Sequence, residues 1–263
     1  MKLWSGVLSP FSAKVRMALA EKKLPYETLT VSWTRKTLWG PKSPEFLAVS
    51  PRGQVPVLID GDVTVFDSTV ICEYLEDRYP EPPLMPDSPA GRAVCRQLED
   101  EADFAMAQEV TPLVQELFTK TDDATRNMAR VAAAAEALRR RYDALEKHLV
   151  GREYLCRSFS VADIATFLVV GFASTLGVSP ADDHENLRAW TDRVRARPSV
   201  AKTFQQAAES MAGFEMIPQL IASGMFKRQY RDHRLEWMVR SGGLDIVLDG
   251  LRQGNIRFTT ELR

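Results

Sequence analysis

The sequence has few of the residues that build disulfide frameworks or metal sites. It contains three cysteines and three histidines among 263 residues, and no two cysteines form a CxxC pair. An odd number of widely spaced cysteines is typical of a reducing compartment, so we expect a cytoplasmic protein without a disulfide framework. The histidines lack the spacing of metal ligands, and we predict no metal site.

Strong net charge and long apolar runs are also missing. The formal charge of -1 produces little long-range field, which disfavours nucleic acid and an anionic membrane as partners. The most apolar stretch, 164–173, is shorter than the roughly 20 residues that cross a bilayer, so it predicts a buried helix. Residues 1–8 hold no long apolar core, and we expect no signal peptide.

Residues 1–80 carry alternating strand and helix signals and predict an α/β domain. Ser9-Pro10 and Ser43-Pro44 each place a capping residue before a proline, which favours a helix start. Asp60-Gly61 between two apolar runs predicts an antiparallel hairpin. The expected order is βαβαββα, with strands at 2–7, 26–31, 55–59 and 63–66 and helices at 10–22, 44–49 and 68–79.

The rest of the chain has helical character. Prolines at 80, 82, 83, 86 and 89 predict a stiff linker at 81–90, followed by an all-helical domain at 91–212. Ser160 and Asp163 have the spacing of a capping box, which predicts the start of the buried helix. Further helices are expected at 92–118, 125–150, 186–197 and 200–211.

Residues 213–263 form an expected helical extension. Phe226, Tyr230, His233 and Trp237 recur at helical spacing and predict a largely aromatic stripe. A second short helix is expected after Gly242-Gly243. Because apolar stripes are costly to expose, we predict that the extension folds back on the body of the protein or contributes to dimer contacts.

Three ordered motifs resemble those of the cytosolic glutathione transferases. They are LSPFSAKVR at 8–16, PRGQVPVL at 51–58 and FDSTVI at 66–71. Any one of these motifs would be weak evidence for the resemblance, but the set is specific because its members occur in the expected order. The resemblance covers about residues 1–211 and implies a thioredoxin-like domain followed by a helical bundle. It points to a serine-type member of bacterial kind, whereas 213–263 has no counterpart that we can place.

The resemblance implies that glutathione is bound as a co-substrate and that its thiol is activated as a thiolate. Ser9 is the first choice for the activating hydroxyl, since it stands at a helix start, where the dipole also favours negative charge. Ser12 is the second choice. The simpler interpretation of Ser9 is a helix cap without chemistry.

The other two motifs imply the peptide-binding residues. A cis bond between Val55 and Pro56 would turn the Val55 main chain toward the ligand, as in an added strand. The alternative is an ordinary trans proline at a strand start. Asp67 and Ser68 are expected to bind the ammonium and carboxylate of the γ-glutamyl group, or one of them simply caps the helix. Further glutathione contacts are expected from Gln54 and Lys42.

The expected reaction is attack of the thiolate on a hydrophobic electrophile held by the helical domain, in a protein that is expected to be a homodimer. The predicted electrophile pocket comprises Phe11, Glu101, Phe104, Ala105 and Gln108. The alternative is a non-catalytic regulatory protein of the same fold, because 79–86 also resembles the stringent starvation proteins. The cysteines are expected to have core or incidental roles.

Overall fold

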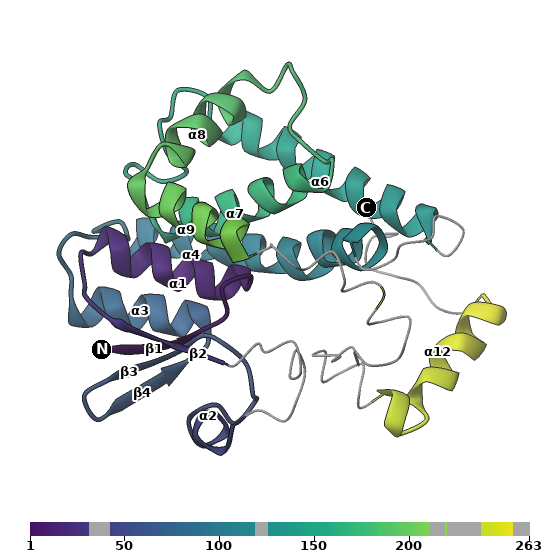
Figure 1. Ribbon diagram of the computed structural model, residues 1–263. Coiled ribbons are helices and arrows are strands. Elements are labelled where there is room, and N and C mark those ends of the chain that lie inside the picture. Colours follow the sequence, from purple (N-terminus) through teal and green to yellow (C-terminus); the bar gives the residue numbers. More distant parts are fainter. Residues whose placement is uncertain (32–42, 119–125, 211–218, 220–237, 255–263) are drawn as a thin grey trace.

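The computed structural model describes residues 1–31, 43–118, 126–210, 219 and 238–254, and Figure 1 shows its arrangement. A four-stranded sheet with strand order β2-β1-β3-β4 forms the N-terminal domain. The strand β1 pairs in parallel with β2 and antiparallel with β3, and β3 pairs antiparallel with β4 through the predicted Asp60-Gly61 hairpin. The strands are β1 (Lys2–Ser5), β2 (Glu27–Thr30), β3 (Val57–Asp60) and β4 (Val63–Phe66).

The helices α1 and α3 cover one face of this sheet, and α2 lies at the other side of the domain (Figure 1). Ser9 and Ser43 cap α1 and α2 with a proline in the first turn, as predicted. The βαβαββα order expected from the sequence is therefore confirmed. The three helices are α1 (Pro10–Glu21), α2 (Pro44–Val49) and α3 (Ser68–Arg78).

The predicted all-helical domain is also confirmed, with one change. Instead of a single helix over 92–118, the chain forms α4, a π-helical turn, the short α5 and a second π-helical turn. Pro112 in α5 has no N–H to donate, and the Thr111 hydroxyl donates to the Met106 carbonyl at 2.9 Å, so the regular hydrogen-bond ladder is interrupted there. The elements are α4 (Pro89–Ala105), η1 (Met106–Val110), α5 (Thr111–Leu113), η2 (Val114–Phe118), α6 (Met128–His148), α7 (Val161–Thr175), α8 (Glu185–Arg195) and α9 (Pro198–Ser210).

The central helix α7 contains the apolar stretch that the sequence assigned to a buried helix. Its capping box is present, with Ser160 at the cap and Asp163 at the third position. The Asp163 carboxylate is fully buried and also accepts hydrogen bonds from the Leu155 N–H at 2.9 Å and the Trp190 indole at 2.8 Å. Within the described residues, no helix combines the length and apolar character needed to cross a membrane.

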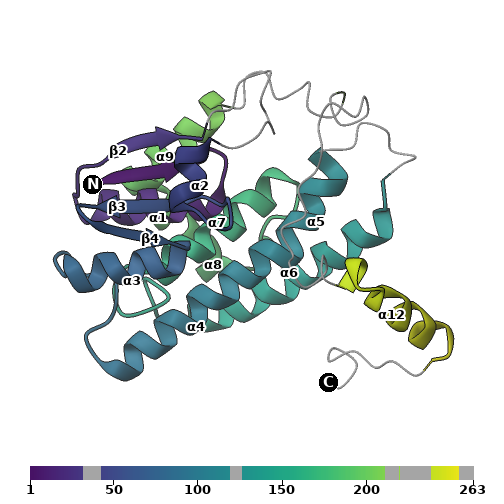
Figure 2. The same cartoon turned by 90° about the horizontal axis from the view of Figure 1, so that it is seen from below.

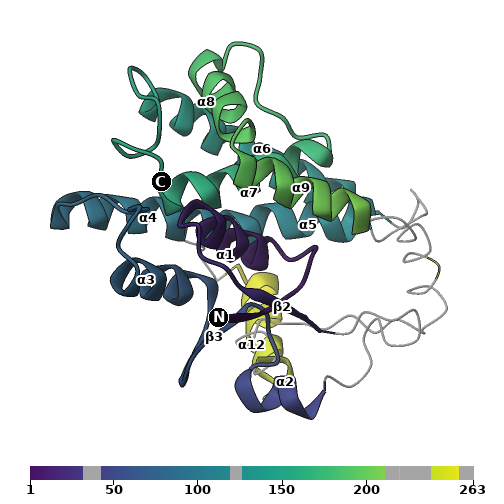
Figure 3. The same ribbon diagram turned by 60° about the vertical axis from the view of Figure 1, so that its left-hand side comes forward.

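The helix α1 lies between the two domains. It packs against α3 from the first domain and against α7 and α9 from the second, and Figure 3 shows it enclosed in this way. All residues from Ser12 to Leu19 are buried. Just after the helix, the Lys22 ammonium donates to the Tyr79 carbonyl at 2.8 Å and the Pro82 carbonyl at 3.0 Å. These bonds fix the start of the predicted linker against α1.

One helix of the C-terminal extension is described, α12 (Gly243–Arg252), where the second short helix was expected. Two of its apolar side chains are exposed in the single chain, Ile246 at 75% and Leu251 at 48%. Figures 1 and 2 show α12 standing apart from the sheet. The aromatic stripe predicted at 226–237 lies outside the described residues.

An ion pair between Glu21 and Arg197 joins the end of α1 to the start of α9. The Glu21 carboxylate accepts from Arg197 Nε at 3.0 Å and from the Ser199 hydroxyl. Burial by itself would raise the pKa of Glu21, but the hydrogen bonds from Arg197 and Ser199 outweigh it and hold the pKa below its ordinary value of 4.5.

We predict that Glu21→Gln lowers the free energy of unfolding by about 2 kcal/mol at pH 7. The folded-state pKa is depressed, so the stabilisation is complete above about pH 4.5 and is lost as the pH falls through the folded value. Urea unfolding of wild type and variant between pH 3 and 8 measures this gap. Glu136→Gln, which breaks an exposed pair with Arg140, is the control with little effect. A gap that stays constant down to pH 3 would contradict the assignment.

Candidate functional site

The turn between β1 and α1 holds both serines proposed for thiol activation. The Ser9 N–H donates to the Gly6 carbonyl at 3.1 Å, and the Ser9 hydroxyl accepts from the Ser12 N–H at 3.2 Å. Ser9 is half-buried, and it donates its own hydroxyl hydrogen to no group among the described residues. A hydroxyl that caps a helix as an acceptor still has one hydrogen to donate, so capping and thiol activation are compatible at Ser9.

Ser12 has a different environment from Ser9. Its hydroxyl accepts from the Gly6 N–H at 3.2 Å, and the residue is fully buried inside the turn. A ligand at the surface of the turn therefore has access to Ser9 rather than to Ser12.

The peptide bond between Val55 and Pro56 is cis. A Cβ atom at Gly6 would lie 3.3 Å from Val55 Cγ2 and 3.4 Å from Ser9 Cβ. The absence of a side chain at Gly6 thus allows the cis-proline loop and the start of α1 to approach each other closely. Two of the three segments singled out in the sequence meet at this point.

The backbone of Gln54 is fixed by a buried serine just before the cis bond. The Ser50 hydroxyl donates to the Gln54 carbonyl at 2.8 Å and accepts from the Gln54 N–H at 2.9 Å. These bonds orient the loop and leave the half-buried Gln54 side chain as a candidate contact. Lys42, the other expected contact, lies outside the described residues.

The third segment forms the start of α3. The exposed Asp67 has a positive φ of 78°, and its carboxylate accepts from the Thr69 N–H at 3.0 Å, so it is the helix cap. Ser68 is the first residue of the helix and is 4% exposed. First-turn N–H groups have no partner within a helix, and this end therefore suits an anion.

A buried charge cluster lies beside this helix start and was not expected from the sequence. The Lys14 ammonium in α1 pairs with Glu99 and, at 2.7 Å, with Asp103, both in α4. It also donates to the Thr69 hydroxyl at 3.2 Å, and that hydroxyl donates to Glu99 at 2.6 Å. The only sequence signal for this cluster was two carboxylates four residues apart on one face of a helix.

The cluster holds one cation between two carboxylates. Burial would lower the pKa of Lys14, but Asp103 and Glu99 outweigh it, and the pKa lies above its ordinary value. Burial raises the pKa of Asp103, and the nearby charges of Glu99 and Asp67 act in the same direction. The Lys14 ammonium lowers this pKa, but its effect is smaller than the sum of the others. The site therefore has an excess of negative charge close to Asp67.

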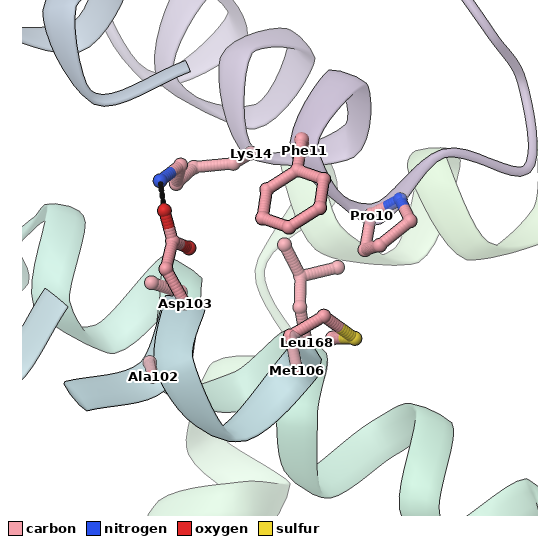
Figure 4. Close-up of a pocket in the computed structure, with 8 residues that line it drawn as sticks. Pro10, Phe11, Lys14, Ala102, Asp103, Met106 and Leu168 are labelled. Atoms are coloured by element: carbon pink, nitrogen blue, oxygen red, sulfur yellow. Dashed lines mark hydrogen bonds and ion pairs between the residues drawn. The ribbon is translucent and has the colours of Figure 1, made fainter. Parts of the chain in front are cut away.

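A small cavity of about 10 Å³ lies between α1 and the helices α4 and α7 of the second domain (Figure 4). Such a volume holds about one water molecule. Phe11 is the one member of the predicted electrophile pocket that lines it. The lining residues are Pro10, Phe11, Lys14, Ala102, Asp103, Met106, Ala165 and Leu168.

The other four predicted pocket residues lie on different sides of α4 and η1. Phe104 is 58% exposed, Glu101 is exposed and pairs with Arg141, Gln108 is exposed, and Ala105 is fully buried. The helix face that meets α1 carries 99, 102, 103 and 106, because Lys14 pairs with the carboxylates of that face. Helical spacing alone could not choose between these neighbouring faces.

The three cysteines are free and buried. Burial raises the pKa of the Cys72 thiol, next to the charge cluster, to about 12, so this thiol is not suited to reaction as a thiolate. Among the described residues no group of three histidine, cysteine, aspartate or glutamate side chains is placed to hold a metal ion.

Family models and relatives agree with this arrangement. The N-terminal domain model of glutathione S-transferase matches residues 8–78, and the C-terminal domain model matches residues 102–198. Glutathione S-transferase 3 from Zea mays is 31% identical over 77% of this chain and 92% of its own length. A stringent starvation protein A homolog from Pasteurella multocida is 29% identical over 79% of this chain and 92% of its own. A crystal structure of a glutathione S-transferase from Rhodospirillum rubrum superposes with a TM-score of 0.67 and 32% identity, covering 77% of this chain and 90% of that one.

The chain therefore belongs to the glutathione S-transferase family, whose members use glutathione as co-substrate. The matched N-terminal model includes the Ser9 turn, the cis-proline loop and the start of α3.

We predict that Lys14→Met lowers the free energy of unfolding by about 3 kcal/mol, because it leaves the buried Glu99 and the half-buried Asp103 without their cation. Adding Asp103→Asn is expected to restore part of this loss, since one of the carboxylates is then neutral. Urea unfolding of the single and double variants measures both effects. Arg96→Met, which breaks an exposed pair with Glu73, is the control with a change of about 1 kcal/mol or less. A Lys14→Met variant as stable as the wild type would refute the role of the cluster.

Proposed function

We propose that this protein binds glutathione between the cis-proline loop and the start of α3, and that the Ser9 hydroxyl stabilises the glutathione thiolate. The observation that carries the proposal is the close approach of Ser9 and Val55 across Gly6. It brings the side chains of Ser9 and Val55 to the same place beside Gly6, so a peptide whose thiol lies beside its own backbone could reach the Ser9 hydroxyl and the Val55 main chain together.

The Val55 main chain supports binding of the cysteinyl part of the tripeptide. Val55 lies just outside β3 and forms no backbone hydrogen bond to another described residue. Its N–H and C=O are therefore available for pairing with an extended ligand, as in the addition of a strand. The neighbouring Gln54 is held in place by Ser50 and is our further candidate contact.

The start of α3 supports binding of the γ-glutamyl group. The ligand carboxylate would meet the first-turn N–H groups and the Ser68 hydroxyl, and the ammonium would meet Asp67. The excess negative charge of Glu99 and Asp103 over Lys14 favours a cation at the same end. Lys42 remains our candidate for the glycyl carboxylate.

The chemistry that these residues support is activation of the thiol. A free thiol has a pKa of about 8.5, and the thiolate is the attacking species. The Ser9 hydroxyl would donate to the sulfur, and the N-terminal end of α1 would favour the negative charge. The sulfur then bonds to an electrophilic carbon, and either a leaving group departs with the bonding electrons or a double bond takes them and is protonated. We propose a small hydrophobic electrophile as the second substrate and a cytoplasmic homodimer as the working form.

A regulatory function without catalysis is the second candidate. The cavity between α1 and α4 holds no more than about one water, so the described residues offer little room for an electrophile there. The match to a stringent starvation protein homolog over most of the chain agrees with this alternative. A purely regulatory protein does not need the Ser9 hydroxyl, so calorimetry with reduced glutathione and a conjugation assay distinguish the two candidates.

We predict that Ser9→Ala lowers kcat for conjugation of glutathione to a chloronitrobenzene by about a hundredfold, because the sulfur loses a preorganised donor. Ser9→Thr retains the hydroxyl and is expected to keep most of the activity. Ser12→Ala should mainly reduce stability, since Ser12 is buried within the turn. If a folded Ser12→Ala protein loses activity while Ser9→Ala keeps full activity, Ser12 rather than Ser9 is the activating residue. If the wild type does not bind glutathione, the regulatory candidate is favoured.

A further inference from the structure

Arg16 is a buried cation directly beneath the Ser9 turn. The residue is 6% exposed. One terminal nitrogen donates to the Ser5 hydroxyl at 2.9 Å and the Gly6 carbonyl at 3.1 Å, and the other donates to the Val7 carbonyl at 3.1 Å. The guanidinium thus holds three consecutive residues of the turn with groups that carry no net charge.

The charge of Arg16 has no counter-ion among the described residues. No carboxylate forms an ion pair with it there, and its buried Nε has no hydrogen-bond partner. Burial lowers the pKa of Arg16. The nearby Tyr26 acts in the opposite direction but does not offset the effect of burial. A buried, unpaired charge is expensive, and a side chain that only needed to fill this space would not require a guanidinium.

The Gly6 carbonyl connects Arg16 to Ser9. This oxygen accepts from both the Arg16 guanidinium and the Ser9 N–H, each at 3.1 Å. The Gly6 N–H in turn donates to the Ser12 hydroxyl, and the Ser12 N–H donates to the Ser9 hydroxyl. Arg16 is therefore one hydrogen-bonded group away from the residue that would meet the sulfur.

We propose that Arg16 is a positioning residue that holds the turn so that Ser9 can donate to the glutathione sulfur, and that its unpaired charge behind the turn favours the thiolate. This inference rests on the proposed function. Holding the carbonyls of Gly6 and Val7 keeps their negative ends paired with a cation instead of facing the sulfur.

The other charged groups around α1 differ from Arg16 in their pairing. Lys14 on the same helix is matched by Glu99 and Asp103, so that cluster offers no net positive charge. Tyr26 is the titratable group near Arg16, and burial raises its pKa, which keeps it neutral at physiological pH. Arg16 is thus the buried cation of α1 whose charge remains available to the sulfur.

The test compares Arg16→Met, Arg16→Lys and, as control, Arg96→Met at an exposed arginine. The first measurement is amide hydrogen exchange without ligand. We expect at least about tenfold faster exchange at Gly6 and Ser9 in Arg16→Met, since the shared carbonyl loses its anchor. The second is the pKa of the bound glutathione thiol, followed by the ultraviolet absorbance of the thiolate. We expect it to rise by about one unit in Arg16→Met and by less in Arg16→Lys, which keeps the charge.

At neutral pH, kcat should fall about tenfold in Arg16→Met with a smaller change in KM, because thiolate formation rather than binding is impaired. A role in stability alone would leave the thiol pKa unchanged. The proposal is overturned if Arg16→Met keeps wild-type exchange at Ser9 or the wild-type thiol pKa. Should Arg16→Met not fold, hydrogen exchange in Arg16→Lys decides, because a lysine ammonium cannot hold the three groups that the guanidinium holds, and wild-type exchange at Ser9 in that variant would overturn the proposal. If the wild type binds no glutathione, the proposed function fails, and the exchange result still decides whether Arg16 holds the turn.

Discussion

Burial of α1 on every side is the constraint on which the rest of the structure depends. The sheet domain and the helical domain both pack on this helix, and its residues 12–19 are all buried. Any charged residue in it must therefore find its partners within the protein. Lys14 finds two carboxylates on α4, and Arg16 finds the carbonyls of the preceding turn. One cation joins the domains, and the other shapes the turn at the start of the helix.

The candidate site lies at the end of α1 where these requirements meet. Its two components are the close approach of Ser9 and Val55 across Gly6 and the charge cluster next to the start of α3. Because stability and chemistry use the same helix, substitutions there affect both.

Membership of the family does not by itself determine whether the protein catalyses a reaction. Relatives named as a glutathione S-transferase and as a stringent starvation protein A homolog both match this sequence over most of the chain. What distinguishes the two kinds of function is local, namely a hydroxyl with a free hydrogen, an open main-chain edge and a helix start suited to an anion. The first two meet beside Gly6, and the start of α3 lies beside Lys14 of α1, while the cavity between α1 and α4 is small, about 10 Å³. Fold alone does not decide between these functions.

The sequence by itself determined the elements whose signals are local. The Ser9-Pro10 helix start, the Asp60-Gly61 hairpin and the Ser160–Asp163 capping box depend on neighbours a few residues apart, and all three are present. Only the tertiary structure decided which face of α4 meets α1, because several faces have similar spacing and the choice depends on Lys14 finding distant carboxylates. The same holds for Arg16, whose hydrogen-bond partners, and whose lack of a counter-ion among the described residues, follow from the burial of its helix by two domains. Contacts between residues far apart in the chain cannot be recognised in a single sequence, whereas the residues that determine caps and turns are adjacent in it.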